Sequence, residues 1–188
     1  MGRNEKNIPQ GCKFGKHILK WGDIMIFVTV GTHEQPFDRL LKQIDKMIEE
    51  EKIKEEVIVQ KGYTDYEMKN CKSYKLIGYN EMQQYINKAR IVITHGGPAS
   101  FLNVLSFNKI PIVVPRRKEF YEHVNDHQFE FAKQVERRMG NIIVASNEDE
   151  IEDAIINYDD KIAELNINVS NNNKNFIKNF ENEIRKIL

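Results

Sequence analysis

The ten residues Ile-Val-Ile-Thr-His-Gly-Gly-Pro-Ala-Ser, numbers 91–100, decide the fold of this 188-residue chain. The apolar run Ile91–Thr94 predicts a short buried strand. A glycine pair, Gly96 and Gly97, closes the strand, and a helical pattern follows from about Ala99. The chain therefore passes directly from a strand into a helix, which is the unit from which parallel sheets are built.

The same alternation of strand and helix recurs on both sides of this stretch. Several predicted strands are continuous apolar runs, as expected when helices cover both faces of a sheet. We therefore predict an α/β fold with a doubly wound, mostly parallel, Rossmann-like sheet that binds ligands at the carboxyl ends of its strands. Asn80 and Asn147 are the expected caps of two helices. The other predicted strands are 26–30, 57–59, 74–77, 111–115 and 141–144, and the predicted helices are 36–48, 81–89, 99–107, 124–138 and 148–158.

The composition argues against several classes of protein. The chain has 28 basic and 28 acidic side chains and a formal net charge of zero, whereas nucleic-acid-binding domains carry a basic excess. No apolar run approaches the roughly 18 residues needed to span a bilayer, and no secretory signal is evident. Cys12 and Cys71 form no C-x-x-C pair, which argues against a disulfide framework or a metal cluster and fits a reducing cytoplasm.

The chain divides into a leader, residues 1–24, and one domain, residues 25–188. The leader has five basic residues against two acidic ones. It is either a basic arm for an anionic membrane surface or a disordered extension before a true start at Met25. The domain is expected to end in an amphipathic helix that packs on the domain or docks onto a partner. The apolar residues of this helix are Phe176, Phe180, Ile184 and Ile187.

The first candidate site is the glycine turn itself. Gly96 and Gly97 would let the backbone approach a ligand closely, and the helix start offers free N–H groups and the positive end of its dipole. Together with the hydroxyl of Ser100, the turn suits a diphosphate. It matches neither a Walker A loop nor G-x-G-x-x-G, and the alternative is a tight turn that binds nothing. Asn103 lies on the same helix face as Ser100 and is placed to reach a ribose.

The second candidate site follows the strand at 111–115. It opens with three cations, residues 116–118, and contains Asp126 and Gln128, which can hydrogen-bond sugar hydroxyls. His123 and His127 have the i, i+4 spacing of metal ligands. The H-E-x-x-H pattern is absent, so a metal site is the weaker interpretation. The alternative is a solvated, capped start of a helix.

The third candidate site follows the first strand. Gly31 and Thr32 could meet a ligand with a backbone group and a hydroxyl. His33 and Glu34 are candidates for an acid or a base, because histidine titrates near neutral pH. The alternative is that His33 only hydrogen-bonds its own loop.

Three motifs in order, Phe27–Thr32, His95–Gly97 and Asn125–Gln128, resemble the C-terminal, nucleotide-sugar-binding half of GT-B glycosyltransferases of family 28. The resemblance covers about residues 25–157. It is greatest to the stand-alone catalytic subunits of two-subunit enzymes. These are the bacterial β-1,4-galactosyltransferase subunits for capsular and exopolysaccharides and the eukaryotic UDP-GlcNAc transferase subunit of N-glycan assembly.

The resemblance implies roles for individual residues. The turn at His95–Gly97 with Ser100 would hold the UDP diphosphate, residues 126–128 would contact the donor sugar, and residues 31–33 would line the cleft. Many relatives have a ribose-binding glutamate where this chain has Asn103, whereas the bacterial capsular subgroup shares the asparagine. His33 is the candidate base, and no metal or cofactor besides the UDP-sugar donor is expected. The expected substrate-binding residues are Gly31, Thr32, His95, Gly96, Gly97, Ser100, Asn103, Arg116, Glu122, His123, Asn125, Asp126, His127 and Gln128.

The implied function is that of the catalytic, UDP-sugar-binding subunit of a membrane-associated, inverting hexosyltransferase. It would transfer galactose or GlcNAc to a lipid-linked saccharide in capsular or exopolysaccharide biosynthesis, at the inner face of the membrane. A whole GT-B enzyme has two Rossmann-like domains and this chain holds one, so a membrane-anchored, acceptor-binding subunit would complete the cleft. The alternatives are a non-catalytic nucleotide-sugar-binding or scaffolding subunit and a nucleotide-sugar epimerase, whose usual two-domain length argues against it.

Overall fold

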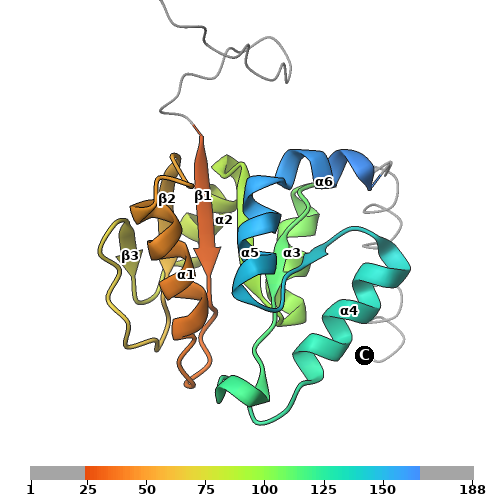
Figure 1. Ribbon diagram of the computed structural model, residues 1–188, viewed down its shortest axis with the longest axis horizontal. Helices are drawn as coiled ribbons and strands as arrows, with labels where there is room; N and C mark the ends of the chain where they lie inside the picture. Colours follow the sequence, from red (N-terminus) through yellow and green to blue (C-terminus); the bar gives the residue numbers. More distant parts are fainter. Residues whose placement is uncertain (1–23, 166–188) are drawn as a thin grey trace, which may run out of the picture.

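The computed structural model describes residues 24–165, which form a six-stranded sheet between two layers of helices (Figure 1). Every strand pair is parallel, and the strand order is β3-β2-β1-β4-β5-β6. The predicted doubly wound, Rossmann-like α/β fold is therefore confirmed. The strands are β1 (Met25–Thr29), β2 (Glu56–Gln60), β3 (Lys72–Tyr74), β4 (Ile91–His95), β5 (Ile112–Val114) and β6 (Ile143–Val144).

Two helical layers form because alternate residues of each strand point to opposite faces of the sheet. Ile26 and Val28 of β1 pack in a cluster with α1 and α5, whereas Phe27 packs on the other face with α2. A third apolar cluster joins α3 and α4 to the end of the sheet formed by β5 and β6. The helices are α1 (Asp38–Glu49), α2 (Tyr79–Lys88), α3 (Pro98–Ser106), α4 (His127–Met139), α5 (Glu148–Ile156) and α6 (Tyr158–Glu164), and η1 (Lys118–Phe120) is a 3-10 turn.

Two of the expected elements are placed differently in the structure. The third strand is Lys72–Tyr74, not 74–77, because it is an edge strand that pairs with β2 through its backbone and needs no apolar run. Helix α4 begins at His127 rather than near Val124. Residues 122–126 are irregular bends, and the turn η1 lies before them and ends at Tyr121, which has the left-handed conformation with φ 57°.

The expected helix caps have opposite outcomes. Asn147 caps α5, because its side chain accepts a hydrogen bond from the N–H of Glu150 at 2.8 Å. The cap predicted at Asn80 is wrong, since α2 begins at Tyr79, two residues earlier than expected, and its N-cap is Gly78. The helix predicted over 148–158 is split into α5 and α6. Tyr158 begins α6 and its buried hydroxyl donates to the carbonyl of Ile110 at 2.6 Å.

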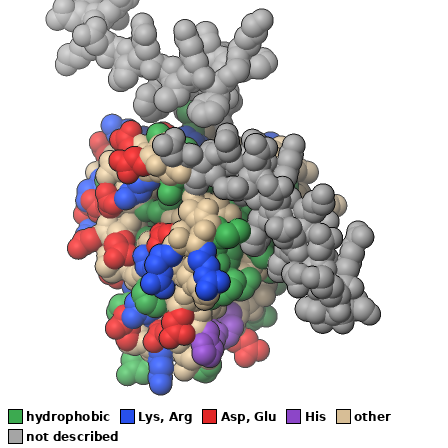
Figure 2. Space-filling model, turned by 90° about the vertical axis from the view of Figure 1, so that its right-hand side faces the viewer, with side chains coloured by type: hydrophobic (Ala, Val, Ile, Leu, Met, Phe, Trp, Pro, Cys, Tyr) green, Lys and Arg blue, Asp and Glu red, His purple; other side chains and the backbone are tan. Residues whose placement is uncertain are grey.

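The expected C-terminal helix at 176–187 lies outside the described residues, as does the predicted leader apart from its last residue. Within residues 24–165, no helix has the length and apolar character that would let it cross a membrane. The face seen in Figure 2 carries acidic and basic side chains interspersed with hydrophobic ones. That face therefore shows no extended patch of positive charge of the kind that binds nucleic acid.

Candidate active site

A cavity of about 740 Å³ opens at the carboxyl ends of β1, β2 and β4, beside the first turn of α3. Parallel strands bring their carboxyl ends to one edge of the sheet, and this is where ligands of such folds bind. Residues of the β1–α1 loop form one wall and the start of α3 forms the other. The lining residues are Thr29, Gly31, Thr32, His33, Glu34, Gln60, Met82, His95, Gly97, Pro98, Ala99 and Ser100.

The imidazole of His95 lies between two of the predicted glycines. A Cβ atom on Gly31 would lie 2.5 Å from His95 Nε2, and one on Gly97 would overlap the ring at Cε1. Gly31 also has a φ of 76°, which disfavours other residues. We expected the glycines of the turn to leave room for a ligand. In the structure, the ring of His95 fills the space beside Gly31 and Gly97 and forms part of the cavity wall.

The hydrogen bonds of His95 fix its protonation. Nδ1 accepts from the N–H of Gly97 at 3.0 Å, and Nε2 lies 2.9 Å from the hydroxyl of Ser100. Burial, reinforced by the positive charge of Arg116, lowers the pKa of His95 to about 4, so the ring is neutral at pH 7. Since Nδ1 accepts, the single ring proton is on Nε2 and is donated to Ser100 Oγ. The Ser100 O–H is thereby left to donate to a ligand oxygen.

His33 lines the same cavity from the β1–α1 loop and is exposed at its surface. Its Nδ1 accepts a hydrogen bond from the N–H of Gln35 at 3.2 Å. Partial burial and the charge of Arg116 lower the pKa of His33, so the ring is neutral at pH 7. In this arrangement Nδ1 is an acceptor, so the single ring proton is on Nε2, which is a donor. To act as a base, His33 would have to release the Gln35 N–H or exchange its proton between the two nitrogens.

His123, in the β5–α4 loop, is the near neighbour of His33, with ring centroids 5.1 Å apart. It repeats the same local bond, because its Nδ1 accepts from the N–H of Asn125 at 3.3 Å. His127 does not join this pair: it begins α4, and its side chain is exposed. No group of three or more candidate metal ligands occurs among residues 24–165.

Asp126 and Gln128, expected to contact a sugar, are engaged with their own surroundings. The Asp126 carboxylate accepts from the N–H of Lys118 at 3.0 Å and from Arg117 Nε at 3.2 Å, and these bonds lower its pKa. Gln128 Oε1 accepts a hydrogen bond from the backbone N–H of Arg116 at 3.3 Å. A Cβ on Gly96 would lie 2.9 Å from Gln128 Cβ, so this glycine permits the close approach of α4. Asp126 therefore braces the β5–α4 loop in this structure.

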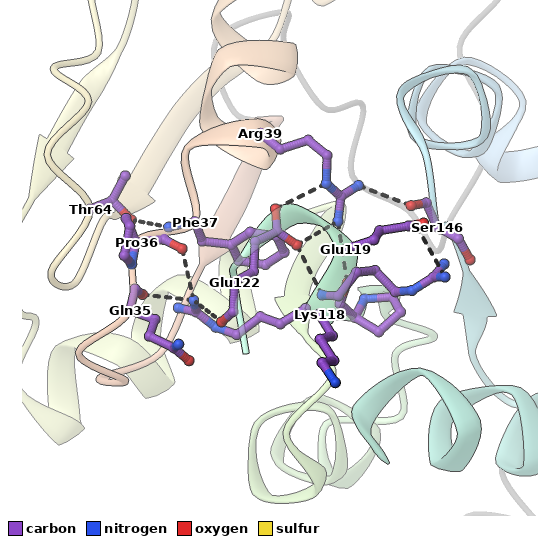
Figure 3. A network of polar contacts seen from close by, with 12 residues as sticks. Gln35, Pro36, Phe37, Arg39, Thr64, Lys118, Glu119, Glu122 and Ser146 are labelled. Carbon is purple, nitrogen blue, oxygen red and sulfur yellow. Dashed lines mark hydrogen bonds and ion pairs between the residues drawn. The ribbon is translucent and has the colours of Figure 1, made fainter. Parts of the chain in front are cut away.

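Arg116 and Glu122, two further expected binding residues, are buried beneath the loops and do not line the cavity. The Glu122 carboxylate forms a two-pronged ion pair with Arg39 of α1, both bonds being 3.0 Å long (Figure 3). Sequence analysis missed Arg39. Arg39 lies between the apolar positions Phe37 and Leu40 in the sequence. This placement was the available signal, because a charge near a buried helix face needs a partner.

Asn103 is also away from the cavity lining. Its side-chain oxygen accepts from Gln83 Nε2 at 3.3 Å, which ties α3 to α2. Sequence analysis did not single out Met82 as a wall residue, although it lines the cavity. Gln60, at the end of β2 directly beside Thr29 of β1, also lines the cavity, as expected for the carboxyl end of a parallel strand.

The fold and the cavity together define a Rossmann-like α/β domain with a cavity at the carboxyl ends of its strands, where domains of this fold bind ligands. The family model described as the glycosyltransferase family 28 C-terminal domain matches residues 25–184, and the chain belongs to this family. No protein in a search of the curated proteins matches the chain.

Several solved structures share the fold. The glycotransferase of kitacinnamycin has a TM-score of 0.59 and 16% identity over 88% of this chain and 42% of its own. MurG of Acinetobacter baumannii has a TM-score of 0.51 and 15% identity over 85% of this chain and 46% of its own. The UDP-GlcNAc 2-epimerase of Methanocaldococcus jannaschii, solved with UDP-GlcNAc and UDP, has a TM-score of 0.51 and 16% identity over 72% of this chain and 38% of its own. The chain thus spans less than half the length of each.

Proposed function

We propose that this chain is the catalytic, UDP-sugar-binding subunit of an inverting hexosyltransferase. The observation that carries the proposal is the cavity between the β1–α1 loop and the first turn of α3, in a chain of glycosyltransferase family 28. The donor would be UDP-galactose or UDP-GlcNAc. The acceptor would be a lipid-linked saccharide of capsular or exopolysaccharide biosynthesis at the inner face of the membrane.

The proposed chemistry is a direct displacement at the anomeric carbon. The acceptor oxygen forms a bond to this carbon as the bond to the UDP oxygen breaks, and the configuration inverts. The N-terminus of α3 and the Ser100 hydroxyl would stabilise the charge that develops on the leaving diphosphate. Arg116 lies buried beneath the loops and adds positive potential. These groups supply the charge stabilisation for which other enzymes use a divalent cation.

His33 is the proposed base within this chain. It lines the cavity and is neutral at pH 7, which is the state that accepts a proton. The proton of the acceptor hydroxyl would go to the nitrogen that His33 makes free when it leaves the N–H of Gln35. The competing possibility is that a partner subunit supplies the base and this chain only binds the donor.

The cavity lies at one edge of a single Rossmann-like domain formed by residues 24–165, and the chain covers less than half of each matched solved structure. We propose that a membrane-anchored, acceptor-binding subunit closes the cavity. Closure would exclude water that otherwise hydrolyses the donor. The non-catalytic, donor-binding subunit remains the second candidate, and the structural likeness to an epimerase rests on the fold alone.

The test is a transfer assay on the chain together with membranes of the cells that produce it. UDP-galactose and UDP-GlcNAc, each labelled in the sugar, are supplied separately, and label in the extracted lipid is counted. The proposal predicts chain-dependent labelling from one donor. The His33→Gln variant should lose transfer while it still binds UDP. Unchanged transfer by this variant would favour a base on the partner, and label released as free sugar or epimerised donor would contradict the transferase proposal.

A further inference from the structure

We propose that Arg116 is a positioning residue that ties the loop carrying His33 to the loop carrying His123. The inference rests on the proposed function insofar as these loops bound a donor site. The sequence suggests a cation for the substrate at this position. The structure instead encloses the Arg116 side chain completely, with 0% of it exposed.

The guanidinium of Arg116 holds both ends of the β1–α1 loop. Its Nη2 donates to the carbonyl of Val30 at 3.1 Å, immediately before the loop. Its Nη1 donates to the carbonyls of Gln35 at 2.7 Å and Pro36 at 3.2 Å, at the end of the loop. The segment between these anchors, residues 31–34, is the wall of the cavity. One side chain therefore sets the span and shape of that wall.

The same guanidinium reaches the second loop. Nη1 of Arg116 also lies 3.3 Å from the carbonyl of Glu122, the residue before His123. The carboxylate of Glu122 is fixed in turn by Arg39, which donates to the carbonyl of Ser146 at 3.0 Å as well (Figure 3). The β5–α4 loop is thus anchored to α1 and to the end of the sheet. His33 and His123 then face each other across the two anchored loops.

The contacts require the planar shape of arginine. The Arg116 Cζ lies 4.7 Å from the ring centroid of Phe37, which is itself buried, so the guanidinium is held over an aromatic face. Four carbonyl oxygens at fixed directions suit a delocalised fork of N–H donors. A lysine would keep the charge but could not reach the same set of oxygens. The conservative substitution therefore separates a role of charge from a role of shape.

The test compares Arg116→Lys and Arg116→Met with the wild type by NMR and by titration with UDP. Arg90→Met is the matched control, because Arg90 pairs with Glu55 and Asp159 at the start of β4, away from the cavity. In the wild type and the control, a nuclear Overhauser effect should join the rings of His33 and His123. We expect both Arg116 variants to lose it and to bind UDP at least about tenfold more weakly, with lysine giving no rescue.

An Arg116 variant that retains the ring contact and the wild-type affinity would overturn the proposal, because the residue would then serve stability alone. Rescue by lysine would also overturn it. If the variants do not fold, NMR of the wild-type chain tests the positioning role instead. Its Arg116 Nη protons should exchange slowly and should not shift when UDP binds. A large shift would mean direct contact with the phosphate and would refute the positioning role. If the wild type shows the ring contact but binds no UDP even when its membrane partner is present, the proposed function fails and the positioning of the loops stands.

Discussion

The ring of His95 occupies the space that a side chain at Gly97 would need. It also accepts the Gly97 N–H at Nδ1, so the two residues are fitted to each other by both shape and hydrogen bonding. The glycine is required by its neighbour, since its own backbone is extended, with φ −70° and ψ 126°. This pair sets the wall of the cavity at the start of α3.

Gly97→Ala should therefore destabilise the chain through overlap with His95. Forcing a methyl group into a packed site costs about 1–3 kcal/mol, and urea unfolding would measure it. Gly78→Ala is the matched control, because a Cβ there has nothing within 4 Å. It should change the stability by less than about 0.5 kcal/mol. A second substitution, His95→Ala, should recover part of the loss in Gly97→Ala, and strict additivity of the two effects would contradict the fitted pair.

The low pKa of His95 predicts how stability depends on pH. The unfolded side chain has a pKa of 6.5, while burial and the charge of Arg116 hold the folded one at about 4. Between these values the unfolded chain binds a proton that the folded chain does not. The neutral His95 therefore makes its full contribution to the free energy of unfolding above pH 6.5. This contribution falls as the pH is lowered and has decreased by about 3 kcal/mol near pH 4. Urea unfolding at several pH values, compared with His95→Gln, measures the difference. Parallel curves for the two proteins would refute a depressed pKa.

The ion pair of Arg39 and Glu122 should contribute far more to the free energy of unfolding than ion pairs on the surface do. Its two side chains are 7% and 4% exposed, so Glu122→Gln leaves a buried guanidinium without its counter-charge. Loss of one partner from such a pair costs about 3–5 kcal/mol. Glu119→Gln is the control. It removes the exposed partner of Arg117 and should cost less than about 1 kcal/mol. Equal losses of stability in Glu122→Gln and Glu119→Gln, measured by thermal or urea unfolding, would contradict the larger contribution of the buried pair.

The arrangement of strands was predictable because local pattern and tertiary burial agree in the central strands. Ile91–Ile93 is apolar throughout, and these residues are buried on both faces of the sheet. The edge strand was misplaced because β3 pairs through its backbone, while Leu76, in the stretch 74–77 that suggested a strand, is 53% exposed. An edge strand carries little signal in its side chains.

The location of the site was predictable to the level of loops, since parallel strands end at one edge. The roles of single side chains were harder to predict. Arg116 follows a strand in a charged run that resembles a solvated surface, and only the packing of distant loops buries it. Its acceptors Val30 and Gln35 lie 86 and 81 residues away in the sequence. Sequence spacing does not encode such contacts, whereas it does place His95, at the end of β4, close to Ser100 in the first turn of α3.

Titration of the full chain with UDP by calorimetry tests the central claim most directly. The account predicts saturable binding of one UDP per chain, abolished in Gly97→Trp, where the indole would displace His95 and fill the cavity. Ser106→Trp, an exposed position at the far end of the same helix, should bind as the wild type does. Binding of UDP that persists in Gly97→Trp, or no binding by the wild type even when its membrane partner is present, would contradict the assignment of the donor site.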